Sequence, residues 1–311
     1  MAVATRPVFI PLERYPYVMT RDITFEWHPG FAKIQGQRNV RSLHRSFMRL
    51  AQGAKVLEIS SKSVIFEPGS DEMTENEAGI ALSAFNLRKL VPSRGCSIPV
   101  ENVYHGGKVF KYGGPFTDLM NEDVTPSAAK RDERLKNHGP IIGFKFEDME
   151  FPINPPSLFY DFLYINALLE NEEKASCVLA HDAFTDIVYN PNKSVGCQAR
   201  SAAIFVALNK MGLIDNARTF EGFLKLFNAD TAKRLAPMRE AAPATPAKPE
   251  SAPQATTETQ SLSVGDTIVH KAWGEGVVKE INGSIANVSF ASVGEKKMGV
   301  AWIVQNCDRS E

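Results

Sequence analysis

Apolar residues recur every three or four positions in three segments of the chain, a spacing that makes one face of an α-helix apolar. We therefore predict helices over residues 39–51, 156–173 and 197–213. A shorter helix is expected over residues 219–227. The apolar stripe of the first segment consists of Val40, Leu43, Phe47 and Leu50, and that of the second of Leu158, Phe162, Ile165 and Leu169.

Strands are predicted in the first third of the chain. Residues 20–30 are rich in β-branched and aromatic residues and end at Pro29-Gly30, and residues 55–63 run from an apolar into a polar stretch. Helices outnumber these strands, but the strands exclude an all-α protein. The fold class of this part of the chain is therefore predicted to be α+β, mainly helical with a few strands.

The composition changes at residues 237–261, which contain five prolines, many Ala and Thr, and no aromatic residue. Such a segment cannot bury enough apolar surface to offset the entropy of the chain, so it is predicted to be a disordered linker. The linker divides the chain into a large domain, residues 1–236, and a small one, residues 262–308.

The small domain shows apolar and polar residues in alternation, interrupted by glycines. An Asn-Gly pair at 282–283 between two alternating runs is a strong signal for a β-hairpin. Four or five short strands in fewer than fifty residues indicate an all-β domain, and we expect a small SH3-like barrel.

Composition and charge exclude some classes of protein. The formal net charge of the 311 residues is −1, which gives no global signal for nucleic-acid binding, although a local patch remains open. The first 22 residues contain three prolines and several charges, and no apolar run reaches membrane length, so we expect a cytoplasmic protein without a membrane segment. The cysteines are scattered and form no CxxC pair, which argues against zinc and against any other metal. They are Cys96, Cys177, Cys197 and Cys307.

Residues 100–110, VENVYHGGKVF, combine an acid, two rings and an amine with a Gly-Gly pair. If the segment is helical throughout, Glu101, Tyr104, His105 and Lys108 share one face. A solvated helix face is the plain alternative. Other polar segments have plain alternatives too: Phe85 suits a core, Asp182 suits a turn, and Arg200 suits pairing with a carboxylate.

The order of these segments resembles the NADAR family of N-glycosidases linked to NAD and ADP-ribose. Four segments carry the resemblance, which spans most of residues 20–225: Ser83–Asn86, Glu101–Lys108, Asp182–Asp186 and Gln198–Arg200. The SSKS segment at 60–63 and the AKRD segment at 129–132 resemble one branch, the antitoxins paired with DarT-type toxins that ADP-ribosylate guanine in DNA. This sequence departs from the family pattern at Asn102, at Thr185, and at residues 105–107.

The resemblance implies roles for individual residues. Glu101 would stabilise the oxocarbenium character of the sugar or act as a base on water, with Asp182 as a second acid. Lys108, together with Lys62 and Arg200, would neutralise the pyrophosphate and assist the leaving base. Ring stacking is expected from Phe85, Tyr104 and Phe184, and contacts to ribose or a base edge from Asn86 and Gln198. Gly106 and Gly107 would permit close approach of the ligand to the backbone. No cofactor is implied.

The small domain resembles the Tudor-like C-terminal domain of UvrD/PcrA-type DNA helicases over residues 262–304. The matching residues are Gly265, Asp266, Val269, His270, Trp273, Gly274, Gly276 and Val278. Gly274 and Gly276 would permit a tight turn between strands. The resemblance implies a tether to RNA polymerase or to another partner, which would raise the local concentration of the catalytic domain.

The resemblance thus implies an enzyme that removes ADP-ribose from guanine in nucleic acid, as an antitoxin or counter-defence with a DarT-type toxin as its partner. One alternative is an N-glycosidase for small molecules such as riboflavin-pathway intermediates. Another is a non-enzymatic sensor of ADP-ribose or NAD. The sequence leaves open the choice among DNA, RNA and small molecules, the oligomeric state, and whether the protein comes from a host or a phage.

Overall fold

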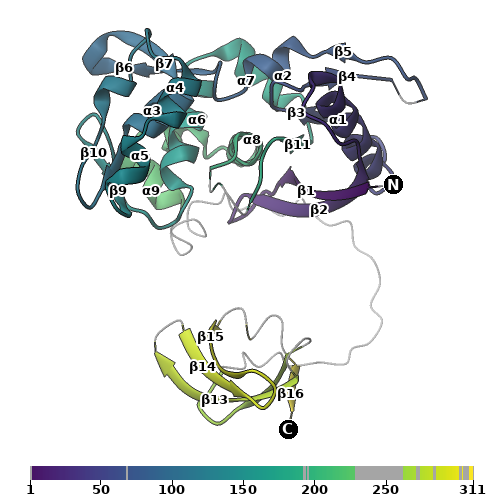
Figure 1. Ribbon diagram of the computed structural model, residues 1–311, viewed down its shortest axis with the longest axis vertical. Helices are drawn as coiled ribbons and strands as arrows, with labels where there is room; N and C mark the ends of the chain where they lie inside the picture. The colour runs from purple at the N-terminus through teal and green to yellow at the C-terminus, as the bar shows by residue number, and fades with distance from the viewer. Residues whose placement is uncertain are drawn as a thin grey trace, which may run out of the picture. The chain divides into compact units, whose positions relative to one another are not determined.

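A computed structural model describes residues 2–67, 69–191, 194, 196–227, 262–270, 274–282, 285–300, 303 and 308–310. The chain divides into two compact units, residues 1–240 and 241–311. The predicted linker, residues 237–261, lies outside the described residues. Figure 1 shows helices and sheets combined in the larger unit, as the α+β prediction requires, and strands alone in the smaller one.

A four-stranded sheet lies at one side of the larger unit, in the order β2-β1-β11-β3. The strands are β1 (Ala2–Pro11), β2 (Val18–Trp27), β3 (Val56–Glu58) and β11 (Ala183–Thr185). β1 and β2 form a long antiparallel pair, whereas β11 runs antiparallel to β1 and parallel to β3. The sequence did not predict β1, because its prolines argue against a central strand. Pro7 lies outside the part of β1 that pairs with β11, which consists of Val8 and Phe9.

The predicted helices are present. The helix predicted over residues 39–51 corresponds to α1 (Lys33–Met48), which packs on β2 through Val40, Leu43 and Phe47. Leu50 lies beyond the helix end and is 57% exposed, so its assignment to the apolar stripe was wrong. The other three segments contain α6 (Leu158–Leu169), α8 (Gln198–Lys210) and α9 (Phe220–Leu226). Helices α6 and α8 are buried nearly all round, and they form the centre of the main core.

Short elements complete the larger unit. A three-stranded antiparallel sheet consists of β8 (Lys108–Phe110), β9 (Ile141–Phe146) and β10 (Met149–Phe151). Two small hairpins are formed by β4 (Val64–Ile65) with β5 (Thr74–Glu75), and by β6 (Arg88–Val91) with β7 (Cys96–Pro99). The remaining α-helices are α2 (Glu77–Ala81), α3 (Val100–Gly106), α4 (Pro126–Arg131), α5 (Arg134–Asn137) and α7 (Glu172–Leu179).

The smaller unit is all-β, as predicted. Its antiparallel sheet has the order β15-β14-β13-β12-β16 and its own apolar core, which includes Ile268, Val278, Val288 and Phe290. The strands are β12 (Thr267–His270), β13 (Gly274–Asn282), β14 (Ile285–Phe290), β15 (Gly294–Gly299) and β16 (Asp308–Ser310). Gly276 lies inside β13, so its expected place in a turn was wrong. A Cβ atom at this position would lie 2.5 Å from the ring of Phe290, and packing therefore requires the glycine.

Among the described residues, none of the helices combines the length and the apolar character needed to cross a membrane.

Candidate functional site

Glu101 is held in the first turn of α3, which begins directly after β7. Its backbone N–H donates to the carbonyl oxygen of Ala84 at 3.0 Å, and the neighbouring Val100 and Val103 are buried in the main core. This anchoring draws the carboxylate inside the protein, and Glu101 is only 6% exposed. A buried carboxylate must be paired, because desolvation of an isolated charge is costly.

Two nitrogen donors converge on the Oε1 atom of Glu101. Lys130 Nζ lies at 2.8 Å and His105 Nε2 at 3.2 Å. Burial raises the pKa of Glu101, but the hydrogen bonds and the charges of His105 and Lys130 outweigh it, and the pKa falls to about 2. The carboxylate is therefore ionised at any physiological pH.

His105 connects Glu101 to Lys108. Lys108 Nζ lies 2.9 Å from His105 Nδ1, and an ammonium group can only donate, so Nδ1 is the acceptor. Nε2 then carries the proton that His105 donates to Glu101. Burial lowers the pKa of His105, which favours this neutral form, and burial also lowers the pKa of Lys108 to about 8.

The two glycines serve protein packing. The helix ends at Gly106, and Lys108 is the first residue of β8, so the segment is not helical throughout. A Cβ atom on Gly106 would lie 2.7 Å from the Met120 side chain, and one on Gly107 would lie 2.7 Å from the Lys145 carbonyl oxygen. Neighbouring protein atoms therefore account for both glycines without a ligand.

Tyr104 belongs to an aromatic group beside the carboxylate. Its ring stacks on Phe144 at 5.8 Å and meets Tyr160 edge-on at 5.1 Å. Lys108 Nζ lies 4.6 Å from the centre of the Tyr104 ring, within the range of a cation–π contact. Tyr104 thus positions Lys108, and protein side chains already cover much of its ring.

Lys130 is one residue of the site that the sequence analysis did not predict. Its side chain is 57% exposed, although its amine reaches the buried Glu101 and lies 5.4 Å from the ring centre of Phe85. Phe85 is 37% exposed, so these two side chains form the accessible rim of the cluster. The AKRD segment contains this lysine, but a separation of 29 residues from Glu101 gives no local signal of their contact.

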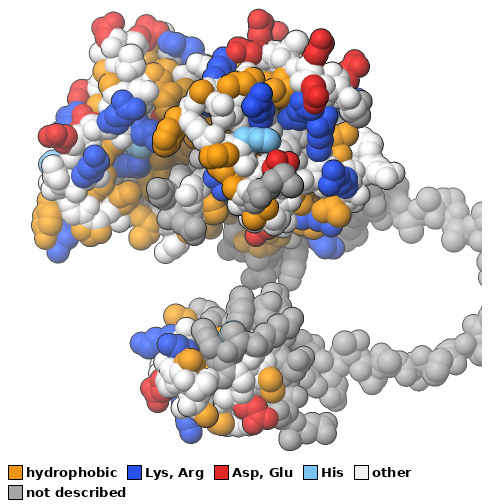
Figure 2. Space-filling view, turned by 45° about the vertical axis from the view of Figure 1, so that its right-hand side comes forward, with side chains coloured by type: hydrophobic (Ala, Val, Ile, Leu, Met, Phe, Trp, Pro, Cys, Tyr) orange, Lys and Arg blue, Asp and Glu red, His pale blue; other side chains and the backbone are white. Residues whose placement is uncertain are grey.

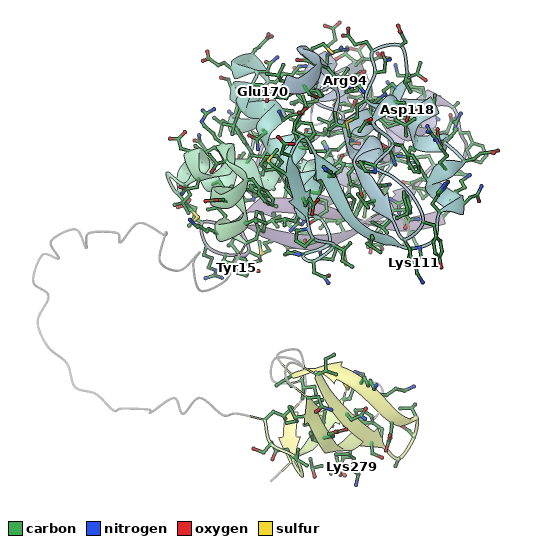
Figure 3. All side chains as sticks on the ribbon, turned by 90° about the vertical axis from the view of Figure 1, so that its left-hand side faces the viewer. Tyr15, Arg94, Lys111, Asp118, Glu170 and Lys279 are labelled. Atoms are coloured by element: carbon green, nitrogen blue, oxygen red, sulfur yellow. The ribbon has the colours of Figure 1, made fainter. Side chains whose placement is uncertain are left out.

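Polar contacts hold the segment that carries Lys130. Arg134 binds Asp118 at 2.6 Å and Asp132 at 2.9 Å, which links α5 and the end of α4 to the loop before them (Figure 3, where Asp118 is labelled). Asn102 donates to the carbonyl oxygens of Leu119 and Val124. The residue that departs from the family pattern at 102 therefore positions the loop that follows Leu119.

Gln198 links a second buried acid to the site. Its Oε1 atom accepts from the Ala84 N–H at 2.7 Å, and its Nε2 atom donates to Asp186 Oδ2 at 3.1 Å. Because Ala84 also accepts from the Glu101 N–H, a chain of hydrogen bonds runs from Asp186 to Glu101. Both polar atoms of the Gln198 side-chain amide thus bond to protein groups, and Gln198 holds these segments together.

Asp186 and Glu58 form a pair of buried carboxyls at the ends of the parallel strands β11 and β3. Burial raises the pKa of both groups, and the proximity of Glu58 raises that of Asp186 further. The charges of Glu101 and Asp186 both act on the hydroxyl of Tyr160, whose pKa is raised chiefly by burial. Glu101 and Asp186 therefore both lie within electrostatic reach of Tyr160.

Asp182 lies at the other end of β11. Its carboxylate accepts the backbone N–H of Lys55 at 2.9 Å. Asp182 and Asp186 are four positions apart along an extended chain, a span of about 13 Å. The structure thus brings Asp186, and not Asp182, into the network that reaches Glu101.

The side chains of four other predicted binding residues contact other groups of the protein. Phe184 is fully buried in the core, so its ring offers no free face to a base. Arg200 binds the fully buried Asp161 and donates to Ser157 Oγ at 2.7 Å. Asn86 donates to the Ile80 carbonyl and to Ser83 within its own turn. Lys62 packs its alkyl chain against Gly36 of α1.

Comparison with known proteins gives one family. No curated protein matches the chain. The profile of the family described as DarT1-associated NADAR antitoxin matches residues 4–236. This range includes Glu101, His105, Lys108 and Lys130, which together form the Glu101 cluster. This match covers most of the 311 residues, and it confirms the resemblance found in the sequence. The chain belongs to the family of DarT1-associated NADAR antitoxins.

Proposed function

We propose that the larger unit is an N-glycosidase that removes ADP-ribose from guanine in nucleic acid and so opposes a DarT-type toxin. The family gives the antitoxin role. The observation that carries the catalytic part is a buried, ionised Glu101 flanked by two lysines, Lys108 and Lys130. A fixed negative charge of this kind stabilises a sugar that becomes positive as its bond to the base breaks.

The reaction breaks the bond between C1″ of the ribose and the guanine nitrogen, and water adds to C1″. Glu101 lies where a carboxylate can stabilise the oxocarbenium-like sugar or take a proton from the attacking water. The departing base needs a proton or a positive neighbour. Lys108 suits this role because a donor with a pKa of about 8 is still protonated at neutral pH and gives up its proton readily.

The remaining charges suit the rest of the substrate. Lys130 is exposed and reaches the site, so it can bind the pyrophosphate of ADP-ribose, and Phe85 beside it offers a ring for stacking. Asp186 takes the place that Asp182 held in the sequence interpretation, as the second acid linked to Glu101 through Gln198 and Ala84. Its raised pKa suits a proton donor.

The direct test is incubation of the protein with an oligonucleotide that carries ADP-ribosylated guanine. We expect free ADP-ribose and an oligonucleotide restored to its original mass. Parallel reactions contain small N-glycosides, and binding of ADP-ribose is measured separately. Turnover of the small glycosides alone would indicate the small-molecule enzyme, and binding of ADP-ribose without release of any base would indicate a sensor.

The rate is expected to depend on pH through Lys108. Above its pKa of about 8 the amine loses its proton, so kcat should fall by roughly tenfold per pH unit. Towards acid, Glu101 keeps its charge down to a pH of about 2, so it contributes no fall between neutral pH and the onset of acid unfolding. A kcat profile of the wild type and of Lys108→Ala checks this. An alkaline fall that persists unchanged in the variant would contradict the assignment to Lys108 and would assign the fall to Asp186, whose pKa is raised to about 8 by burial and by Glu58.

We also propose that the smaller unit is an SH3/Tudor-like barrel that tethers the enzyme to a partner such as RNA polymerase. Its five strands and separate core support this reading. Deletion of residues 241–311 is then expected to leave turnover of a short modified oligonucleotide unchanged in the purified system. A large loss of kcat on deletion would instead place part of the catalytic site in this unit.

A further inference from the structure

The outward face of α1 and its C-terminal cap carry four arginines, Arg38, Arg41 and Arg45 within the helix and Arg49 directly after its last residue. At 3.6 residues per turn, these positions fall within an arc of about 80°. The opposite face buries Val40, Leu43 and Phe47 in the core. The helix therefore has an apolar face, which packs on the sheet, and a strongly basic face on the opposite side.

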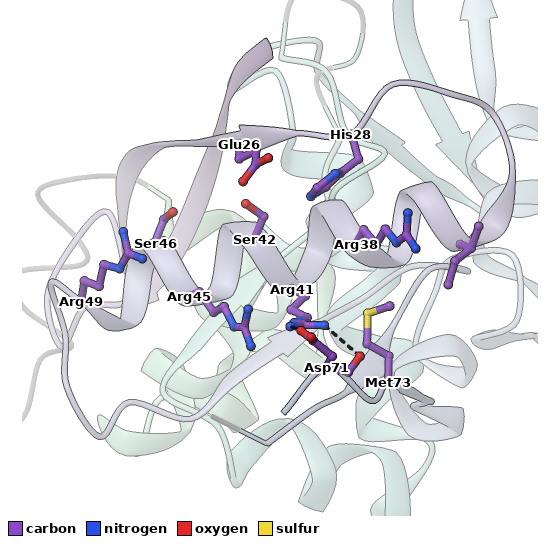
Figure 4. A pocket seen from close by; sticks show the side chains of 11 residues that line it. Glu26, His28, Arg38, Arg41, Ser42, Arg45, Ser46, Arg49, Asp71 and Met73 are labelled. Atoms are coloured by element: carbon purple, nitrogen blue, oxygen red, sulfur yellow. Dashed lines mark hydrogen bonds and ion pairs between the residues drawn. The ribbon is translucent and has the colours of Figure 1, made fainter. Parts of the chain in front are cut away.

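The four arginines line a groove with a volume of about 710 Å³. Ser42 and Ser46 lie between them, and the acidic residues of the lining are Glu26 and Asp71. Figure 4 shows the arginines and serines along α1, Glu26 on β2, and Asp71 bound to Arg41. In Figure 2, Lys and Arg side chains gather on the face of the larger unit that is turned to the viewer. The groove keeps an excess of positive charge after its two carboxylates are counted.

The arginines divide into two pairs. Arg41 binds Asp71, and Arg45 donates to the Ser70 carbonyl at 2.8 Å, so these two hold the neighbouring loop. Arg38 and Arg49 are exposed, and neither has a carboxylate within 4.0 Å among the residues that the structure describes. Like charges three or four residues apart destabilise a helix, so helix stability does not explain the row.

We propose that this groove binds the phosphodiester backbone of single-stranded nucleic acid. Guanidinium groups bind phosphate oxygens through paired hydrogen bonds, and serine hydroxyls are common phosphate ligands. Arg38 and Arg49 lie about 16 Å apart along the helix axis, a length that suits a polymer of phosphates better than a single small anion. The fully exposed ring of Phe31, two residues before α1, provides a surface on which an unpaired base can stack.

The inference deepens the proposed function and rests on it for the class of substrate. The groove would hold the strand while one modified nucleotide occupies the Glu101 cluster. An acidic protein surface, such as that of the toxin, is the rival occupant. The rival would give binding of the protein partner but none of a bare strand.

The test measures binding of an unmodified, fluorescein-labelled DNA strand of about 20 nucleotides by anisotropy, between about 50 and 200 mM salt. The variant Arg38→Gln/Arg49→Gln removes the two arginines that pair with no carboxylate among the described residues. Its matched control is Lys210→Gln/Lys225→Gln, which removes the same charge from two exposed lysines outside the groove. Loss of two phosphate contacts should reduce the slope of log Kd against log salt by about 1.4 and weaken binding about 25-fold at 0.1 M salt. The control should bind like the wild type.

Three results would overturn the inference. The first is an arginine variant with the affinity and salt slope of the wild type, and the second is a wild type that does not bind the unmodified strand at low salt. The third is tighter binding of a duplex of the same length. None of these readouts requires hydrolysis. An inactive wild type that still binds through Arg38 and Arg49 would therefore refute the glycosidase proposal alone, whereas activity without this binding would refute the groove alone.

Discussion

Replacement of Glu101 by glutamine is expected to reduce kcat on ADP-ribosylated guanine by about 10³-fold, the magnitude typical of a group that acts on charge in the transition state. Glutamine has the same shape but no negative charge, so it cannot stabilise the oxocarbenium-like sugar or accept a proton. Its amide oxygen can still accept from Lys130 and His105, which should keep the local fold. Release of ADP-ribose under single-turnover conditions measures the effect.

A matched control for this variant is Glu122→Gln. Glu122 binds Arg88 at 2.6 Å with its side chain 57% exposed, so the same change removes only a surface ion pair. The control should keep full activity. Binding of the unmodified strand should be unchanged in both variants, because the groove on α1 does not include either residue. Turnover by Glu101→Gln close to that of the wild type would remove Glu101 from the mechanism.

Replacement of Arg200 by leucine is expected to destabilise the larger unit by about 3 kcal/mol, because it leaves a buried carboxylate without its cation. Asp161 is fully buried and bonded to Arg200 and to Ser201, whose hydroxyl lies 2.7 Å from Oδ1. Urea-induced unfolding followed by far-ultraviolet circular dichroism measures the loss. The surface pair Arg218–Asp215 serves as the control, and Arg218→Leu should cost less than about 1 kcal/mol.

The double variant Arg200→Leu/Asp161→Asn separates a structural from a binding role for Arg200. Asparagine removes the unpaired charge and can still accept from Ser201, so part of the lost stability should return. If Arg200 is structural, the folded double variant keeps the KM of the wild type. A KM that stays high after stability is restored would mean that Arg200 binds the substrate, as the sequence resemblance implied.

Residues close in the sequence could be paired before the structure was known. Glu101 and His105 are four positions apart, which is the spacing of neighbours on a helix, and the structure places them 3.2 Å apart. The glycines that follow were harder to interpret. Both Gly106 and Gly107 mark a close approach, but the sequence could not say whether ligand atoms or protein atoms fill that space.

Contacts between distant segments needed the tertiary structure. Asp182 and Asp186 flank the same strand and look alike in the sequence, yet they lie at opposite ends of β11. Only Asp186, at the end beside Glu58, connects to Gln198 and through it to Glu101. Phe184 shows the same effect across a sheet. Its neighbours β1 and β3 bury a ring that the sequence alone could equally assign to a ligand site.

The sequence by itself determined the α+β class, the main helices, the all-β character of the smaller unit and the acid in α3, since each depends on local periodicity or on a motif of a few residues. Only the tertiary structure decided that Lys130 binds Glu101, that Arg200 pairs with Asp161, and that four arginines line one groove in a chain of net charge −1. The physical reason is that charge and hydrogen bonding act over a few ångströms in space. Which side chains come within that range is decided by the packing of helices and strands, and spacing along the chain does not reveal it.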